Sequence, residues 1–212
     1  MQLLKRFLAK QAQQPAGLFG NLIAGRAFNK TNKKLEEMIL RLMKVQENSN
    51  VLEIGFGNGR LAGMIADDLK TGLYCGIEIS DVMLHQALKR NKVHVDLGRI
   101  ELKKGSVDQI PHEDEQFDNI ITANTVYFWP DPKNDIREVL RVLKADGTFY
   151  CGFRTREQME AVGVMKDNPD IFRNLYTEGE MKAFLLDAGF SDVSVEYQQD
   201  KPLDSYVAIA RK

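Results

Sequence analysis

Short apolar runs alternate with amphipathic segments along the chain from about residue 50 onward. The apolar runs have the length of buried strands and lie at 51–54, 73–77, 100–103, 118–122 and 148–153. The segments between them have helical periodicity, most clearly at 60–69, 81–90 and 132–143. Strands and helices that alternate in this way predict a parallel sheet with helices on both faces.

The end of the chain has a different pattern. Thr177 and Glu180 have the spacing of a capping box, which predicts the start of a helix that Gly189 ends. Apolar and polar residues then alternate over 193–197 and 206–210, on either side of Pro202, and predict an antiparallel pair of strands. The polar stretch 144–147 predicts a turn between the preceding helix and the strand at 148–153.

The first 34 residues are helical in pattern but rich in glycine, which predicts a short cap added to the main domain. We therefore expect a helical cap or lid at 1–34 and one α/β domain at 35–212. The cap holds seven of the 29 basic residues and no acid, so the rest of the chain, with 22 basic and 30 acidic residues, has a net charge of −8. Such a basic segment covers an anionic substrate, contacts a membrane surface or is a solvated face, and the solvated face is favoured.

The composition is that of an ordinary globular protein of 212 residues, with 43% hydrophobic and 28% charged residues. No apolar run approaches the roughly 20 residues of a transmembrane helix, and charged residues interrupt the start of the chain, so we expect a cytoplasmic monomer or homodimer. A net charge of −1 argues against a general nucleic-acid partner. The histidines (His85, His94 and His112) and the cysteines (Cys75 and Cys151) are scattered along the chain. This spacing predicts that the thiols are free and buried and that no metal site is present.

The stretch VLEIGFGNGR at 51–60 places Gly55, Gly57 and Gly59 directly after a predicted strand. Glycines let the backbone turn sharply and approach a ligand closely, and ligands of such sheets lie beyond the carboxyl ends of the strands. The dinucleotide fingerprint G-x-G-x-x-G would need glycine at Arg60. The pattern here is instead E-x-G-x-G-x-G, which begins at Glu53.

Further stretches follow in order: LYCGIEIS, which contains Glu78, then GSVDQIPHEDEQFD, NTVYFWPDP, REVLRVLKADGTFY and YTEGEMKAFLLDAGFSDVSVE. Together they resemble the class I S-adenosylmethionine-dependent methyltransferases over roughly residues 50–211. The resemblance implies a doubly wound, Rossmann-like α/β fold. Its seven-stranded, mostly parallel sheet would have the order 3-2-1-4-5-7-6, with the last strand antiparallel. It also implies S-adenosylmethionine as the cofactor.

The resemblance further implies which residues contact the cofactor: Glu53, Gly55, Phe56, Gly57, Gly59, Glu78, Ile79, Met83, Ser106, Val107 and Asn124. Glu78 would accept bonds from the ribose hydroxyls, whereas Ser106 departs from the family's common Asp beside the adenine. Substrate contacts are expected from Phe28, Tyr127, Trp129 and Tyr176. Simpler interpretations stay open for three of these residues, since Glu53 can bond the turn's own amides, and Met83 and Trp129 can be core residues.

Methyl transfer from a sulfonium needs a nucleophile that is held close and aligned, so no catalytic triad is required and no catalytic residue is assigned. The leading hypothesis is a methyltransferase that acts on a small molecule. A nicotinamide-dependent oxidoreductase and a non-catalytic cofactor-binding regulator are the alternatives. Nucleic-acid methylation is less favoured, because 124–127 lacks both prolines of the N/D-P-P-Y motif.

Overall fold

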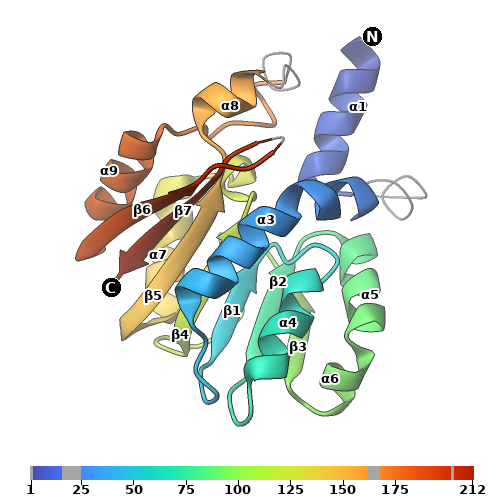
Figure 1. Ribbon diagram of the computed structural model, residues 1–212, viewed down its shortest axis with the longest axis vertical. Coiled ribbons are helices and arrows are strands. Elements are labelled where there is room, and N and C mark those ends of the chain that lie inside the picture. Colours follow the sequence, from blue (N-terminus) through green and yellow to red (C-terminus); the bar gives the residue numbers. More distant parts are fainter. Residues whose placement is uncertain (1, 16–24, 162–167, 202) are drawn as a thin grey trace.

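A computed structural model describes residues 2–15, 25–161, 168–201 and 203–212. Seven strands form one sheet in the order β3-β2-β1-β4-β5-β7-β6 (Figure 1). They are β1 (Val51–Ile54), β2 (Tyr74–Glu78), β3 (Ile100–Lys104), β4 (Phe117–Ala123), β5 (Leu143–Phe153), β6 (Asp192–Gln198) and β7 (Ser205–Arg211). This is the order that the family resemblance implied, so the predicted fold class is confirmed.

The first five strands run parallel, with β1 between β2 and β4. β7 reverses direction and pairs antiparallel with both β5 and β6. The connection after β1 leads to one side of the sheet and the connection into β4 returns to the other. In open α/β sheets, ligands bind in the crevice at such a reversal, beyond the carboxyl ends of the strands.

Helices cover both faces of the sheet. On the face turned to the viewer in Figure 1, α3 (Gly25–Met43) lies over β4, β5 and β7, and α4 (Arg60–Asp68) lies over β2. On the other face, α7 (Pro132–Val142) packs on β5, and α9 (Glu178–Ala188) packs on β6 and β7. The remaining helices lie at the edge of the sheet or in connections: α1 (Gln2–Gln13), α5 (Asp81–Arg90), α6 (Lys92–Asp96), the 3-10 turn η2 (Val126–Phe128) and α8 (Arg156–Ala161).

The two faces of the sheet bury two separate hydrophobic clusters, because successive side chains of a strand point to opposite faces. Val51 of β1 packs with residues of α3 and α4, whereas its neighbour Leu52 packs with residues of α7 and α9. All four residues of β1 are buried. By the same alternation, Glu53 shares the face of Val51 and lies on the side of α3 and α4.

The predicted turn at 144–147 is wrong. α7 ends at Val142 and β5 begins at once at Leu143, so these four residues lie inside the strand. Leu143 pairs with Phe117 of β4, and the next paired residues are Thr148 and Asn119, which marks an irregularity in the ladder. The polar stretch is therefore absorbed as a bulge in a long strand instead of forming a separate turn.

The predicted capping box of α9 is confirmed: Glu180 N donates to Thr177 Oγ1, and Thr177 N donates to Glu180 Oε2. At the other end of the chain, α3 runs without a break through residue 34, the expected limit of the cap. Its residues from Leu35 onward are part of the core on the α4 side. None of the helices in the described part of the chain is long and apolar enough to cross a bilayer.

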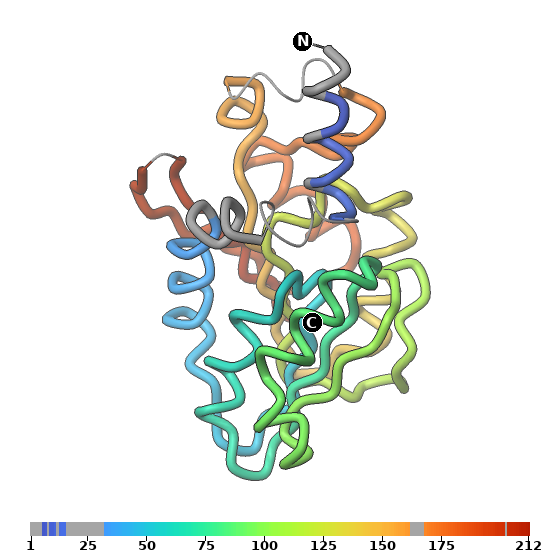
Figure 2. The backbone as a smooth tube through the Cα atoms, turned by 90° about the vertical axis from the view of Figure 1, so that its right-hand side faces the viewer, coloured from blue at the N-terminus to red at the C-terminus, as the bar shows by residue number. Residues whose placement is uncertain are grey.

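Figure 2 shows α1 standing apart from the sheet, beside the segment that leads from α8 to α9. Arg6 of α1 forms an ion pair with Asp170 of that segment, with 2.9 Å between Nη2 and Oδ2. The far end of α1 reaches the carboxyl end of β2, because Gln14 Nε2 donates to the Ile79 carbonyl oxygen at 3.2 Å. The start of the chain therefore contacts the sheet at the carboxyl end of β2, next to the strand that the glycine turn follows.

Candidate functional site

The carboxyl ends of β1, β2 and β4 lie side by side. The glycine turn directly follows β1, the strand in the middle. Ile54 ends β1 and is paired with Ile77 of β2 and Thr122 of β4. The three glycines that follow, Gly55, Gly57 and Gly59, all have positive φ. α4 begins directly after them. Such a turn brings backbone N–H groups and a helix N-terminus to the crevice of the sheet.

The three glycines have different surroundings. A Cβ at Gly55 would lie 2.5 Å from Thr125 Cγ2, and a Cβ at Gly59 would lie 2.6 Å from Asn91 Nδ2. At Gly57, no atom lies within 4 Å of the place that a Cβ would take. Gly55 and Gly59 are thus required by close packing. Gly57, with a φ of 54°, instead faces open space from which a ligand can approach its backbone.

Glu78 ends β2 and turns its carboxylate toward the glycine turn. Oε2 accepts a hydrogen bond from Gly57 N at 2.9 Å, and Oε1 accepts one from Ser80 N at 2.9 Å. Burial raises the pKa of Glu78, while backbone N–H groups of Ser80, Gly57 and Ile79 act in the opposite direction. An ionised carboxylate has about four acceptor positions, so Glu78 has positions left for hydroxyl groups of a ligand.

Glu53 is the second buried carboxyl group at these strand ends, and it is held by the core. Its Oε2 accepts a hydrogen bond from the Tyr74 hydroxyl, and the two residues are 3% and 0% exposed. Burial raises the pKa of Glu53 to about 8, the bond from Tyr74 opposes this shift, and the carboxylates of Glu36 and Glu78 add to it. The carboxyl group therefore holds a proton at neutral pH and bonds a tyrosine, not the amides of the turn.

Asn124 directly follows β4 on the other side of the turn, and its backbone is left-handed, with a φ of 58°. Its Oδ1 accepts a hydrogen bond from the Tyr127 hydroxyl at 3.1 Å. Its Nδ2 donates to Oδ1 of Asn32 in α3 at 2.8 Å. The next residue, Thr125, is the one that packs against Gly55. The residue after Asn124 thus borders the glycine turn, and the side chain of Asn124 is fixed from two sides.

Comparisons with known proteins agree with this geometry. A family described as "Methyltransferase domain" matches residues 52–151. YrhH of Bacillus subtilis (strain 168), which is provisionally named a methyltransferase, is 32% identical over 149 residues, 69% of this chain and 81% of YrhH. The uncharacterized methyltransferase YdaC of the same organism is 26% identical over 191 residues, 90% of this chain and 98% of YdaC.

The fold is also found among solved structures. The crystal structure of a SAM-dependent methyltransferase from Aquifex aeolicus has a TM-score of 0.69 and 21% identity, over 88% of this chain and 97% of that chain. This chain belongs to the class I S-adenosylmethionine-dependent methyltransferase family. The part matched by the family, 52–151, contains the glycine turn, Glu78 and Asn124.

The strand ends of this methyltransferase fit the family's cofactor, S-adenosylmethionine. Its ribose has two neighbouring hydroxyl groups, and Glu78 has acceptor positions beyond those that take the N–H groups of Gly57 and Ser80. A side chain at Gly57 would occupy the space over the turn, and this residue has none. The free acceptor positions of Glu78 and the open space over Gly57 therefore fit a nucleoside.

The remaining expected cofactor contacts surround this cradle. Phe56 is buried against Gly76 of β2, where any Cβ would lie 2.6 Å from the Phe56 ring. Ile79 is half-buried and follows Glu78, with its carbonyl oxygen bonded by Gln14. Met83 is buried in the first turn of α5, where its N–H donates to Ser80 Oγ. Met83 is thus part of the packing that supports the end of β2.

The segment expected beside the adenine forms a tight turn after β3. Gln109 N donates to the Ser106 carbonyl oxygen at 3.3 Å, and Val107 between them is 4% exposed. Val107 belongs to the cluster on the α7 side of the sheet. The Ser106 hydroxyl replaces the acid that the family often has here, so the segment presents mainly an apolar side chain and backbone groups.

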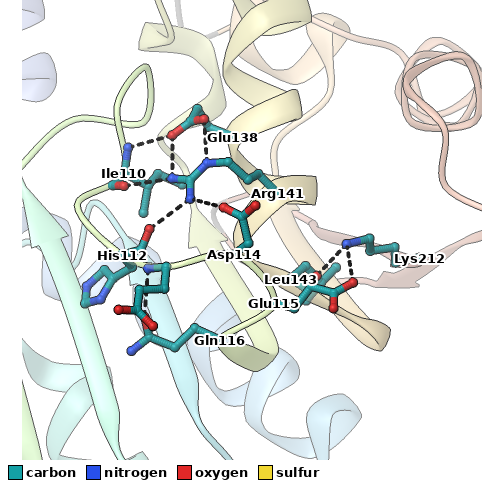
Figure 3. Close-up of polar contacts among 10 residues, drawn as sticks. Ile110, His112, Asp114, Glu115, Gln116, Glu138, Arg141, Leu143 and Lys212 are labelled. Atoms are coloured by element: carbon teal, nitrogen blue, oxygen red, sulfur yellow. Dashed lines mark hydrogen bonds and ion pairs between the residues drawn. The ribbon is translucent and has the colours of Figure 1, made fainter.

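An arginine of α7 holds the continuation of this segment (Figure 3). Arg141 donates to the carbonyl oxygens of Ile110 and His112, to the carboxylate of Asp114 and, with two nitrogens, to the carboxylate of Glu138. Glu138 Oε2 also accepts a bond from Ile110 N at 3.1 Å. All five donors of the guanidinium are used. Arg141 is therefore a structural clamp of this segment and has no donor left for a ligand.

His112, one of the scattered histidines, lies in a shallow hollow of about 730 Å³ between the clamped segment and α7. Its ring meets Phe117 edge to face, with 5.0 Å between the centroids. Burial lowers its pKa, and Lys103 lowers it further. The residues that line the hollow include none of the glycine turn, so the structure does not bring His112 together with that turn.

The aromatic residues expected to contact substrate are mostly buried. Tyr127 and Trp129 are 2% and 3% exposed and belong to the core on the α7 side. The Trp129 indole N–H donates to Thr125 Oγ1 at 3.3 Å, so packing explains this residue. Tyr127 differs, because its hydroxyl reaches Asn124 at the crevice.

Two further expected contacts lie elsewhere or outside the described side chains. Tyr176 stacks on Phe184 of α9, with 5.3 Å between the ring centroids, and lines a second hollow of about 420 Å³. Phe28 is a residue of α3, and its side chain lies outside the described part of the structure. The structure thus assigns Tyr176 to the surface between α8 and α9.

Metal-binding groups are absent from the described residues, where no three His, Cys, Asp or Glu side chains could together hold an ion. Cys75 and Cys151 are free and buried, as predicted. Burial raises the pKa of each thiol to about 12. Neither thiol is a nucleophile at neutral pH, because only the thiolate reacts.

Sequence reasoning missed three residues that shape this site. Tyr74 had a signal, because two-residue alternation and the parallel pairing of β1 with β2 place it on the face of Glu53. Arg141 had a weaker one, since it follows Glu138 by three residues on a helix. Asn32 had none, because its contact with Asn124 depends on how α3 crosses the sheet.

Proposed function

We propose that this protein transfers a methyl group in line from S-adenosylmethionine to a small molecule. The observation that carries the proposal is the pair formed by Gly57 and Glu78. The Gly57 N–H donates to the Glu78 carboxylate, and the space over Gly57 is open. Both residues lie where the strand order reverses, which is where ligands of such sheets bind. The bound cofactor supplies an activated methyl group on its sulfonium. The protein then has to bind, orient and shield the reacting partners.

The proposed cofactor-binding residues are those at the ends of β1 to β4: Gly55, Phe56, Gly57, Gly59, Glu78, Ile79, Met83, Ser106, Val107 and Asn124. Glu53 acts on the site indirectly, because its carboxyl group bonds Tyr74 and supports the strand end from the core. For substrate, Tyr127 takes part through its hydroxyl, and Phe28, Trp129 and Tyr176 remain secondary candidates. No side chain is assigned as a general base.

The cap formed by residues 1–34 is proposed to be a lid over this crevice. Its contacts lie on both sides of the glycine turn. On the β2 side, the Ser80 hydroxyl donates to the Pro15 carbonyl oxygen at 2.5 Å, next to the bond from Gln14 to Ile79. On the β4 side, Asn124 donates to Asn32. A cover held at both sides keeps water from the transferred methyl group and completes the pocket for an acceptor.

A small-molecule acceptor is favoured over a macromolecule for two reasons. N-terminal residues contact the strand ends on both sides of the glycine turn, at Ser80 and at Asn124, and this favours a small acceptor over a folded one. The net charge of −1 gives no attraction to nucleic acid. We propose that the protein works in the cytoplasm, as a monomer or a homodimer.

Two measurements test the proposal. Calorimetry of the purified protein should show S-adenosylhomocysteine binding in the micromolar range, roughly −8 kcal/mol, while NADH should not bind. Incubation with S-adenosylmethionine and pooled metabolites should then release S-adenosylhomocysteine above the rate without metabolites. NADH binding without S-adenosylhomocysteine binding would contradict the cofactor assignment. Cofactor binding with no turnover on any pool would favour a non-catalytic regulator.

A further inference from the structure

β3 is an edge strand of the sheet, and half of its backbone groups face away from β2. In a parallel pair, alternate residues bond the neighbouring strand. Tyr74 N of β2 donates to the Arg99 carbonyl oxygen, so the odd-numbered residues of this segment bond β2. The residues whose N–H and C=O groups point outward are Ile100, Leu102 and Lys104. None of the described residues bonds these outward groups, and such a row is a template for another strand.

The side chains of β3 carry one acid and one base on the same face. Ile100 packs on the α4 side of the sheet, so Glu101 and Lys103 lie on the α7 side by alternation. Glu101 and Lys103 form an ion pair, and their side chains are 43% and 44% exposed. Lys104 already has a partner, since its Nζ lies 2.7 Å from Asp81 Oδ2. Glu101 and Lys103 are therefore the charges that an added strand meets on that face.

A second copy of β3, antiparallel and centred on Leu102, matches both the backbone and the charges. Leu102 would exchange both backbone bonds with Leu102 of the second copy, because its groups point outward. Glu101 would then lie opposite Lys103 of the second copy, and Lys103 opposite its Glu101. In such pairs without backbone bonds the Cα atoms are only about 4.5 Å apart. Opposite charges placed there stabilise a sheet.

The charges also exclude the neighbouring registers. A shift of the second copy by two residues places Glu101 opposite Glu101 in one direction and Lys103 opposite Lys103 in the other. Like charges directly opposite each other are destabilising. The other edge of the sheet, β6, has no such complementarity, because Asp192 and Glu196 are its charged residues and both are acidic. Self-pairing therefore fits β3 in one register and does not fit β6.

Exposed apolar side chains flank β3 on its α4 side. Val93 of α6 and Leu97, which follows α6, are 69% and 61% exposed, and Leu88 of α5 is also exposed. Both α5 and α6 pack against β3, and Figure 2 looks onto the side of the molecule that carries them. A two-fold axis through the paired Leu102 residues keeps α5 and α6 of both copies on the same face of the joined sheet. The second copy would thus bring its own helices beside these apolar side chains.

We propose that two copies of this chain associate through β3, antiparallel and centred on Leu102, and form one continuous sheet across the dimer. The inference concerns assembly and does not rest on the proposed function. Its test is read from molecular mass and amide exchange, so it needs no cofactor or substrate. A short strand with few flanking contacts gives a small interface, and we expect a dissociation constant in the micromolar range.

Sedimentation equilibrium of the purified protein should show a monomer and dimer in exchange. Lys103→Glu and Glu101→Lys each place like charges opposite one another, and each should weaken the dimer by about tenfold or more. An equimolar mixture of the two variants should regain the affinity of the unchanged protein, because each acid of one variant lies opposite a base of the other. Glu196→Lys on β6 is the matched control and should leave the dimer unchanged.

The apolar flank and the backbone are tested separately. Leu97→Glu should weaken the dimer about three- to tenfold, whereas Leu186→Glu, at an exposed leucine of α9, should have no effect. Hydrogen exchange should slow at the amides of Leu102 and Lys104 when the protein concentration is raised above the dissociation constant. Circular dichroism melting checks that each variant is folded.

Three results would overturn the inference. A protein that stays monomeric up to about 1 mM would mean that this edge takes a different chain or none. A dimer that both charge variants leave unchanged would be formed by another surface. Dimerisation that the charge variants weaken, but that their mixture does not restore, would mean that Glu101 and Lys103 act within one copy and do not pair across the edge.

Discussion

Glu78 and Glu53 are two buried carboxyl groups on neighbouring strands, with 6% and 3% exposure, yet they have different partners. Glu78 is bonded by backbone N–H groups of the glycine turn and of the start of α5. Glu53 is bonded by one phenolic hydroxyl inside the core. Backbone donors stabilise a charged carboxylate at the crevice. A single hydroxyl in an apolar setting leaves the carboxyl group with a pKa of about 8.

The difference shows that burial and chemical type do not identify a ligand-binding acid. Both residues follow apolar positions at a strand end, and both lie on the α3 and α4 face. The location of their hydrogen-bond donors distinguishes the two residues. The donors to Glu78 are backbone N–H groups at the crevice, and the donor to Glu53 is a side chain in the core. We therefore expect substitutions near Glu78 to change cofactor binding, and substitutions at Glu53 to change how stability depends on pH.

The largest expected effect is on the crevice side. Gly57→Val should abolish measurable binding of S-adenosylhomocysteine, because its branched side chain fills the space over the turn. Gly98→Val is the matched control, since Gly98 also has positive φ and open space but lies before β3, away from the crevice. Both variants should lose about 1–2 kcal/mol of stability from backbone strain. Normal binding by Gly57→Val, measured by calorimetry, would make the turn purely architectural.

The next effect belongs to Glu53. Between about pH 4.5 and 8 the folded protein holds a proton on Glu53 that the unfolded chain has released. The free energy of unfolding should therefore fall as the pH rises across this window. In the unchanged protein, the free energy of unfolding should fall by on the order of 4 kcal/mol across this window. Glu53→Gln keeps an acceptor for Tyr74 and cannot ionise, so this fall should be absent in the variant. Urea unfolding from pH 4 to 9 measures this, and parallel curves for both proteins would mean that Glu53 is ionised throughout.

A matched pair of substitutions compares the two acids directly. Glu78→Gln should weaken S-adenosylhomocysteine binding by about tenfold to a hundredfold, because charge-assisted bonds to the ribose are lost. Glu53→Gln should change it by less than about threefold, because its group faces Tyr74. Equal losses in both variants would place Glu53 in contact with the ligand after all.

The pH dependence of binding sharpens the same pair. The bonds to ribose favour ionised Glu78, and burial raises the pKa of this residue. Affinity for S-adenosylhomocysteine should therefore fall as the pH is lowered through that raised pKa, by at most about tenfold per pH unit. Calorimetry of Glu78→Gln over the same pH range should show a weaker dependence. A similar fall in both proteins would assign the titration to another group.

The smallest expected effect concerns the contact of the cap beside Glu78. Ser80→Ala removes the bond to the Pro15 carbonyl oxygen and the cap of α5. It should speed dissociation of S-adenosylhomocysteine about two- to fivefold in stopped-flow measurements, because the cover is held less firmly. Ser191→Ala is the control, since that hydroxyl bonds the end of β7 at the far side of the sheet. An unchanged rate would argue against a lid on this side.

Periodicity predicted most of the individual strands and helices, because strands that are buried on both faces have a strong signature, whereas the order of the strands came from the family resemblance. β1 and α5 begin and end where their patterns predicted. The start of β5 was missed, since Gly147 and the charged residues before it have low strand propensity. Pairing of the flanking residues Leu143 and Thr148 with β4 overrides that preference. The local sequence favours a turn at 144–147, but in the sheet these residues form part of β5.

The candidate site was predictable where the chain itself builds it. The glycine turn and Glu78 are local features with a fixed spacing, so their placement follows from the sequence. The bonds from Tyr74 to Glu53 and from Asn32 to Asn124 join residues that are distant along the chain. Their formation depends on register and on the crossing of α3, which periodicity does not determine.

The position of β7 has a consequence for the synthesis of the protein. β7 follows all other strands along the chain, but it lies between β5 and β6 in the sheet and pairs with both. Until β7 has been synthesised and is free to pair, β5 has an unpaired edge on the side away from β4. Unpaired edges are where chains associate wrongly. The sheet is therefore closed only when residues 205–211 have inserted between β5 and β6.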